Sequence, residues 1–434
     1  MMILTQSPGK YSEQKTIALL GAFCLFLSAL EYLIPKPLPF MRLGLANLPL
    51  LLGIDILSFS AYLLLVSIKI LGQALISGTF FSYVFLFSLA GTGVSGLAMY
   101  GLRRFLTSKR IGLIGTSAAG AMLSNIVQLI LAYFFIFGIN ARYIAPPLLV
   151  LGLISGSLLG LFCEIFAQRS RWYAAKQGKE PPGKEEASNR SKKCSMFHLR
   201  TGTPSTPVKR RGLSPLIYDH FEKFRIKRQE QYQKLFSAQS LAAAGLVIIP
   251  SFIFNQDTGW KTAQFLFFYF LAWMTGKKNN PLVTITVILG IMAVNLLSPY
   301  GEILFSLGPL VISKGALLSG FSRGIGLEAL IMLSRAAIRK DLRIRGRFGA
   351  LLGESFRFFG AISERKNFFR GKALALSLDE MLLELDQENM EAGTLPQDGN
   401  SANDKPRKTV LWPGLIILII AVLVSWLFYF MSLT

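Results

Sequence analysis

A short constellation near the N-terminus holds the residue types best suited to attracting an anion. It runs from Glu31 through three alternating prolines to the string Arg42-Leu43-Gly44-Leu45-Ala46-Asn47. Prolines at every second position exclude helix and stiffen the segment, which suits it to cover a pocket. Arg42 lies just before a new apolar run, so its charge would add to the positive end of that helix's dipole. The alternative is that Arg42 only reaches lipid headgroups and the prolines only end a helix.

Polar residues inside apolar runs are the second candidate for chemistry. An unpaired ion there costs about 2.5 to 3.5 kcal/mol, so each should face a partner or a cavity. Asn125 and Gln128 are three residues apart and share a helical face, where they either hydrogen-bond a ligand or tie helices together. Asp55 and Lys69 are predicted to form an internal ion pair. The full set is Glu31, Asp55, Lys69, Gln73, Asn125 and Gln128.

Small residues four apart supply a third pattern. Ala18 and Ala22 lie in the first apolar run, and Gly152, Gly156 and Gly160 repeat the same spacing further on. This spacing lets helices approach closely. Packing within a helical bundle is therefore expected at these positions.

No pattern in the sequence indicates catalysis. Gly276-Lys277-Lys278 is followed by Asn279 and completes no GxxxxGK[ST] phosphate-binding loop, and there is no DDxxD magnesium motif. His198 and His220 are the only histidines, and neither has a metal-like cluster around it. We therefore expect neither catalytic nor metal-binding residues, and we interpret Asp379 and Glu380 as a solvated face.

The composition requires a membrane around these residues. The 434-residue chain is 52% hydrophobic and only 16% charged, against about 25% charged residues in ordinary soluble domains. The net charge of +22 comes from Lys and Arg in runs beside apolar segments. Such runs are typical of cytoplasmic loops and do not favour nucleic-acid binding. The sequence predicts an all-α polytopic protein of the cytoplasmic (inner) membrane, in contact with lipid.

The first 170 residues are predicted to form a six-span membrane module. Its apolar runs lie near residues 16–35, 45–61, 62–78, 80–101, 111–138 and 146–167. Lys10 and Lys15 precede the first run, Arg103 and Arg104 follow the fourth, and Arg169 follows the sixth. An even number of spans separates these basic clusters, which places all of them in the cytoplasm.

The rest of the chain divides into four predicted segments. Residues 171–213 form a basic cytoplasmic linker, and residues 214–372 form a second membrane module. Its spans are expected near 241–256, 259–276, 281–299 and 302–318, followed by a long basic amphipathic helix that begins near Arg323. Residues 373–408 are acidic and polar and are predicted to be disordered. Residues 409–434 contain a terminal transmembrane helix.

The first module resembles the Gx transporter family, which is also called heptaprenyl diphosphate synthase component I. The resemblance covers residues 14–170 and is carried by the string from Arg42 to Asn47, by Lys69, and by Asn125 with Gln128. Ser124 departs from it, because a histidine is expected there. That family is similar to the substrate-binding S components of energy-coupling factor (ECF) transporters. The resemblance implies six spans, a lid after the first span, and a packing contact between modules at Ala18 and Ala22.

The second module is similar to the transmembrane T component of the same transporters. Ser334-Arg335-Ala336 lies where the first short motif that grips an ATPase would be expected, and Arg357 or Arg365 is a candidate for the second. On this resemblance, Arg335 and Arg345 in the basic helices would couple the chain to ATPase subunits supplied by other proteins.

Three functions are compatible with these patterns. The first is a transport component that binds a small anionic, vitamin-like metabolite, for example a flavin, through Arg42, Asn47, Lys69, Asn125 and Gln128, and is driven by a separate ATPase. The second is a membrane subunit of a polyprenyl (heptaprenyl) diphosphate synthase, as the older family name implies. The third is a scaffold for a redox complex, with a vestigial pocket. We favour the first, because it accounts for the lid, the intramembrane polar face and the cytoplasmic helices together.

Overall fold

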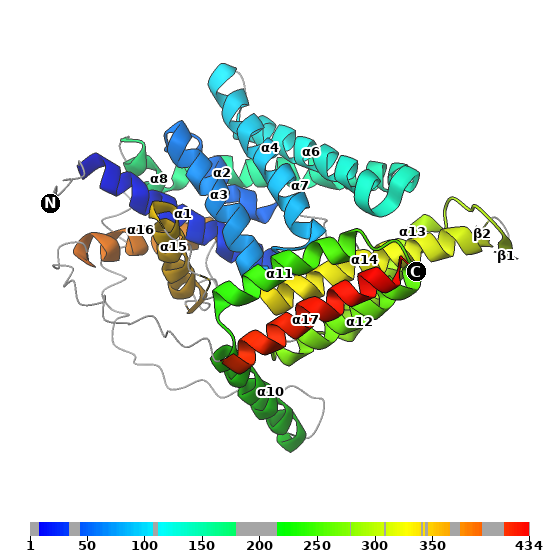
Figure 1. Ribbon diagram of the computed structural model, residues 1–434. Coiled ribbons are helices and arrows are strands. Elements are labelled where there is room, and N and C mark those ends of the chain that lie inside the picture. The colour runs from blue at the N-terminus through cyan, green and yellow to red at the C-terminus, as the bar shows by residue number, and fades with distance from the viewer. Residues whose placement is uncertain are drawn as a thin grey trace.

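A computed structural model describes residues 8–33, 44–106, 112–178, 215–277, 279–307, 310–339, 342, 346–364, 374–392 and 412–433. The described chain is almost entirely helical, with one two-stranded hairpin (Figure 1). Six helical stretches are long and apolar enough to cross a membrane, and a seventh arises if one bent helix pair is counted as a span. The all-α polytopic membrane fold predicted from the sequence is therefore confirmed.

The first module consists of long helices joined by short turns. The stretch from residue 113 to 169 reverses direction through a short π-helix and a 3-10 turn, so that α6 packs against α7. The elements are α1 (Pro8–Leu33), a 3-10 turn (Leu45–Asn47), α2 (Leu48–Gly53), α3 (Phe59–Ser77), α4 (Tyr83–Phe105), α6 (Leu113–Ala132), α7 (Ala141–Arg169) and α8 (Arg171–Lys176).

The second predicted span is a broken crossing. Only Leu48–Gly53 is α-helical, although a span over residues 45–61 was expected. The segment nevertheless runs the length of α1: the Gly44 N–H donates to Glu31 Oε1 at 3.4 Å, and the Ser58 hydroxyl donates to Glu13 Oε1 at 2.7 Å. Eighteen helical residues separate these two glutamates, a rise of about 27 Å. Six passes of the chain therefore make up the first module.

The second module adds a helical bundle and two helices that pack back on the first. The elements are α10 (Pro215–Leu235), α11 (Ala238–Ile253), α12 (Thr258–Met274), α13 (Pro281–Asn295), β1 (Ile303–Leu307), β2 (Leu310–Ser313), α14 (Lys314–Ala337), α15 (Arg347–Glu364), α16 (Leu374–Ala392) and α17 (Trp412–Met431). Helix α14 packs against α11, α12 and α13, and α17 packs against α11 and α12.

The predicted span at 302–318 is wrong. Ile303–Leu307 and Leu310–Ser313 pair as antiparallel strands, and the next helix begins only at Lys314. The sequence Gly308-Pro309 is a turn signal in the middle of this run, and an average of hydropathy does not register it. Turn residues of this kind distinguish a hairpin from a helical span of similar hydropathy.

The expected basic amphipathic helix beginning near Arg323 is also wrong. Residues 314–337 form the membrane-length helix α14, which is largely buried among its neighbours. Arg323 is half-buried there and donates to the Ile136 carbonyl of the first module at 3.3 Å. Arg323 on α14 therefore contacts the first module. Sequence periodicity alone cannot distinguish a basic residue in such a contact from one that faces water.

Helix α16 corrects two further expectations. Residues 374–392 of the segment predicted to be disordered are helical, and Leu382 is fully buried in the core of the first module. Asp379 does not lie on a solvated face, because it is 4% exposed. Its carboxylate accepts from the Ser170 hydroxyl at 2.5 Å and from the Trp172 N–H at 3.0 Å. It therefore caps the first turn of α8.

Replacing Asp379 by alanine should release α16 from the first module. The change leaves backbone N–H groups at the start of α8 without their acceptor, a loss of about 1 to 2 kcal/mol for a helix cap. Hydrogen exchange of α16 amides in the detergent-purified protein should accelerate about 5- to 30-fold. Gln387→Ala, an exposed change on the same helix, is the control. Equal exchange in the two variants would show that Asp379 does not hold α16.

The two modules meet along α14 at a steep angle. The Phe81 N–H donates to Ser334 Oγ at 3.0 Å near one end of α14, while Arg323 reaches the Ile136 carbonyl nearer the other. Eleven residues separate the two positions on α14, about 16 Å along the helix. Phe81 follows the C-terminal end of α3, and Ile136 follows that of α6. Both helix ends lie at the opposite end of the first module from its basic clusters. One end of the first module therefore faces the side of α14, and Figure 1 shows α3 and α4 running across the direction of α14.

Candidate functional site

The first module encloses a small polar cavity between α1, α3, α4, α6 and α7. Its volume is about 30 Å³, room for roughly two water molecules. Four of the five residues predicted to bind a ligand line it. The described lining residues are Glu31, Gly44, Ala46, Asn47, Lys69, Gln73, Thr92, Ala121, Ser124, Asn125, Gln128, Gly152 and Ser155.

Lys69 is the buried cation of this cavity. It lies within α3 with 2% of its surface exposed, and its ammonium group donates to Asn47 Oδ1. Asn47 is held by the turn that begins at Gly44, where φ is +83°, a conformation that glycine adopts without strain. The Asn47 N–H closes this turn on the Gly44 carbonyl at 2.8 Å. The glycine in the Arg42-to-Asn47 string thus positions the amide that meets the lysine.

The two amides of α6 have different roles. Asn125 donates to the Leu148 carbonyl of α7 at 2.8 Å, so it ties two helices together. Gln128 donates to Ser124 Oγ at 3.0 Å, and its own Oε1 is buried without a hydrogen-bond partner. Because a buried acceptor without a donor is costly, Gln128 Oε1 is suited to a ligand donor. Ser124, which departs from the family pattern, holds this amide in place.

Glu31 adds a carboxyl group to the cavity, opposite in charge to the ammonium group of Lys69. It is 5% exposed, near the end of α1, and accepts from the Gly44 N–H. Gln73, Thr92 and Ser155 also line the cavity, although only Gln73 was noted in the sequence. Gln73 follows Lys69 by one helical turn, which is the signal that places both on the same face of α3. The arrangement suits a small polar ligand that carries both an anionic group and hydrogen-bond donors.

Three predicted residues, Arg42, Arg345 and Arg365, lie outside the described residues. The predicted ion pair of Asp55 with Lys69 is wrong. Asp55 pairs with Arg103 at 2.9 Å and accepts from the Tyr173 hydroxyl at 3.2 Å. Lys69 lies ten residues into α3, about 15 Å from the start of that helix, beyond the reach of Asp55. Burial and the neighbouring Asp55 carboxylate raise the pKa of the Tyr173 phenol, which keeps it a hydrogen-bond donor.

Ala18 and Ala22 are fully buried on α1, which packs along α15 of the second module. Gly21 lies on the same side and was not singled out in the sequence. A Cβ at Gly21 would lie 2.9 Å from Ser355 Oγ of α15 and 2.8 Å from Ile68 of α3. The small residues of α1 therefore permit close contact with helices of both modules.

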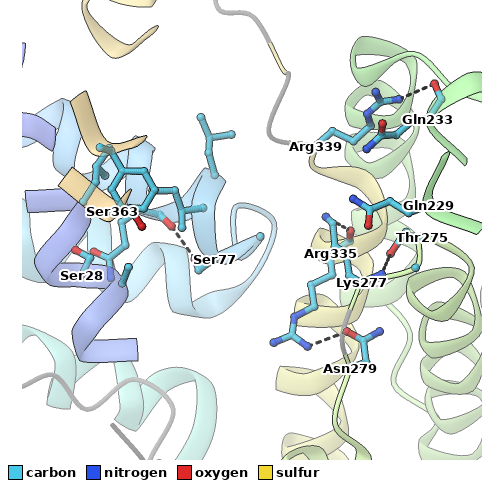
Figure 2. Close-up of a pocket in the computed structure, with 18 of the residues that line it drawn as sticks. Ser28, Ser77, Gln229, Gln233, Thr275, Lys277, Asn279, Arg335, Arg339 and Ser363 are labelled. Carbon is cyan, nitrogen blue, oxygen red and sulfur yellow. Dashed lines mark hydrogen bonds between the residues drawn. The ribbon is translucent and has the colours of Figure 1, made fainter. Parts of the chain in front are cut away.

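Arg335 lies between the modules. It is half-buried near the end of α14, and its guanidinium donates to Asn279 Oδ1 at 3.0 Å. It lines a second, larger cavity of about 770 Å³, whose opposite wall includes Ser28 and Ser77 of the first module (Figure 2). The coupling of Arg335 to an ATPase stays a prediction.

The described residues contain no group of three or more His, Cys, Asp or Glu side chains that could hold a metal ion. Amides, hydroxyls and groups of opposite charge line the smaller cavity, a combination suited to hold and orient a small polar ligand.

Comparison with known proteins supports the resemblance of the first module to a known family. Residues 20–166 match the family model of heptaprenyl diphosphate synthase component I. Residues 239–340 match a model described as a domain of unknown function. That second match names no transporter component, so the T-component resemblance stays a prediction. No curated protein and no solved structure gives a significant match.

Proposed function

We propose, from the family match over residues 20–166 and the polar cavity around Lys69, that this protein is a membrane transport component for a small metabolite with an anionic group. Buried Lys69 carries the proposal. A lysine at this depth is costly unless it faces a partner or a ligand. Asn47 Oδ1 accepts a hydrogen bond from the ammonium group, and the cavity that Lys69 lines is the proposed place for a carboxylate or phosphate of the substrate.

The substrate must widen the cavity when it enters. A vitamin-sized molecule such as a flavin occupies several hundred Å³, whereas the cavity measures about 30 Å³. Glu31 and Gly44 border the cavity and flank residues 34–43, the proline-rich segment that includes Arg42. We therefore propose that this segment admits the substrate and that Arg42 attracts its anionic group.

The crossing of the modules supports a mechanism in which the first module reorients. Lys277 lies in the turn after α12, and Arg339 follows α14, which marks these ends of the second module as cytoplasmic. Gly78 lies at the end of α3, the end that is predicted to face outward. A Cβ added at Gly78 would lie 3.5 Å from the Arg335 side chain. One module must therefore be tilted in the membrane. A first module that can tilt would expose its cavity on either side in turn.

Fixing the modules together should stop transport and preserve binding. Tyr143 of α7 and Ser298, which follows α13, share a side-chain hydrogen bond across the interface, and neither residue is buried. Cysteines at both positions, in a Cys194→Ser background, can be joined by a short bis-maleimide, whereas Cys24 and Cys163 are buried. We expect uptake into proteoliposomes to fall at least 10-fold with substrate still bound. Each single-cysteine variant, treated identically, is the control, and full uptake after cross-linking would rule out reorientation.

Energy is proposed to come from an ATPase on another chain, because the sequence has no phosphate-binding loop. Helix α15 is the proposed contact. One face packs on α1, whereas Gly353 and Gly360 have open space around them and the Arg357 side chain is 69% exposed. An exposed cation beside small residues suits a close helix contact with an acidic groove.

Reversing the charge at Arg357 should uncouple the ATPase. We expect Arg357→Glu to reduce the ATPase activity that co-purifies with this chain at least 10-fold, because a charge mismatch replaces an attractive contact. Lys314→Glu, an equally exposed change on the other side of the bundle, is the control. Unchanged ATPase activity in Arg357→Glu would remove α15 from the proposal.

The family description favours one alternative, a membrane subunit of heptaprenyl diphosphate synthase. Purification of the full chain in mild detergent separates the two functions. Mass spectrometry should find an ATPase and a stoichiometric small molecule if the transport proposal is right. A prenyl transferase with an empty cavity would overturn it and establish the alternative.

A further inference from the structure

The cavity between the modules is large enough for a ligand of its own. Its volume of about 770 Å³ lies within the range of about 300 to 1,000 Å³ typical of small-molecule pockets. The residues labelled in Figure 2 face it from two sides: Ser28, Ser77 and Ser363 on one, and residues of α10, α14 and the α12–α13 turn on the other. It is separate from the polar cavity around Lys69, with only Gln73 common to both linings.

One wall of this inter-module cavity is strongly basic. None of the described lining residues is Asp or Glu. Two of the basic groups are fixed in place: Lys277 donates to the carbonyls of Arg335 and Ile338 at 2.6 Å, and Arg335 donates to Asn279. The cationic lining residues are Arg225, Lys277, Arg335 and Arg339. Such a concentration of positive charge attracts a multivalent anion.

Two neutral polar side chains that line the same cavity have buried atoms without a hydrogen-bond partner. Asn279 accepts from Arg335 through its oxygen, but its Nδ2 is buried without a hydrogen-bond partner. Ser28 Oγ, on the opposite wall, is likewise buried without one. Buried donors of this kind are expected to meet an acceptor, and phosphate oxygens accept several hydrogen bonds at once.

The opposite wall, from the first module and α15, carries an apolar surface beside its serines. This surface is formed by Leu25, Phe26, Leu30, Leu75, Ile76 and Phe359. The basic wall lies at the end of the second module that Lys277 marks as cytoplasmic, which is the level of lipid headgroups. The cavity therefore combines a polyanion site with a surface for a hydrocarbon chain.

From these features we propose that the inter-module cavity binds a phosphate group carried by an amphiphile. The phosphate lies between Arg225, Arg335 and the Asn279 amide, and the apolar part lies against α1 and α3. An anionic phospholipid and a free phosphorylated metabolite share this chemistry. A ligand here contacts both modules, so it stabilises the arrangement in which they meet at Arg335.

Direct binding to the full chain in detergent tests the proposal. The probes are dioctanoyl phosphatidylglycerol, dioctanoyl phosphatidylcholine and inorganic pyrophosphate. The double variant Arg225→Gln with Arg335→Gln removes two cations from the cavity. Lys227→Gln with Lys234→Gln removes two exposed cations from α10 and is the matched control. Ala29→Trp fills the cavity without any change of charge, and it decides the case if the double variant does not elute as a folded protein.

Phosphatidylglycerol binding that weakens at least 10-fold in Arg225→Gln with Arg335→Gln and in Ala29→Trp, but not in the control, would establish a lipid site. The same pattern with pyrophosphate would establish a site for a soluble phosphate compound. Phosphatidylglycerol binding no tighter than phosphatidylcholine, with no pyrophosphate binding, would overturn the proposal. Equal binding by the cavity variants and the control would also overturn it.

Discussion

Lys69→Met is expected to abolish ligand binding by the first module. Removing one partner of a buried, hydrogen-bonded charge interaction costs about 2 to 5 kcal/mol, which corresponds to about 30-fold to several thousand-fold in affinity. Lys69 is 2% exposed and donates to Asn47, so its replacement removes the positive charge from the cavity and leaves Asn47 Oδ1 without this donor. The measurement is the amount of small molecule that co-purifies with the detergent-solubilised chain, quantified by mass spectrometry, followed by titration of the identified ligand.

The exposed Lys314→Met is the control for the loss of a positive charge. Methionine preserves most of the length of the lysine side chain and suits an apolar setting, so Lys69→Met should remain folded. The thermal transition of each variant without ligand checks this. A ligand retained at wild-type affinity by folded Lys69→Met would place the binding site elsewhere and remove the observation on which the transport proposal rests.

Gly160→Leu is expected to unfold the first module. A Cβ at this position would lie 2.5 Å from Ile114 Cα and 2.9 Å from the Leu113 carbonyl oxygen, so α7 cannot accept a side chain without moving away from α6. Overpacking costs about 1 to 3 kcal/mol even where side chains can adjust, and here backbone atoms are in the way. The whole leucine side chain should therefore cost several kcal/mol. The measurement is the thermal transition and the elution profile in detergent.

Gly93→Leu on α4 is the matched control, because no atom lies within 4 Å of a Cβ at Gly93. It introduces the same side chain into another apolar helix and should leave the transition almost unchanged. Equal stability of the two variants would mean that α6 and α7 are not held at the separation seen here. The cavity between them would then not be fixed by backbone packing.

Gly152→Ala tests the same interface at the ligand cavity. A Cβ there would lie 1.8 Å from Asn125 Nδ2, the atom that donates to the Leu148 carbonyl. The amide must swing away, so the helix tie is lost and Asn125 is pushed toward the cavity. We expect a smaller loss of stability than for Gly160→Leu, together with weaker ligand binding. Unchanged ligand affinity would show that the position of Asn125 does not shape the site.

The local character of membrane helices explains how much the sequence by itself determined. In lipid, backbone groups must be satisfied within their own helix, so apolar length largely specifies where most spans lie, whereas the basic clusters predict which loops face the cytoplasm. The cost of burying charged or polar groups likewise singled out Lys69, Asn125 and Gln128, and all three line one cavity. The spacing of Gly152, Gly156 and Gly160 predicted close helix packing at these positions, and in the structure the helix they meet is α6.

Only the tertiary structure decided which groups meet. Asp55 could pair with any cation in the sequence, and its choice of Arg103 over Lys69 depends on how far each lies along its helix. Asp379 looked solvated because its partners, Ser170 and Trp172, are about two hundred residues away. The inter-module cavity has the same origin. Hydropathy and spacing describe each segment alone, whereas ion pairs, caps and cavities between modules arise from contacts between distant segments, which only packing brings together.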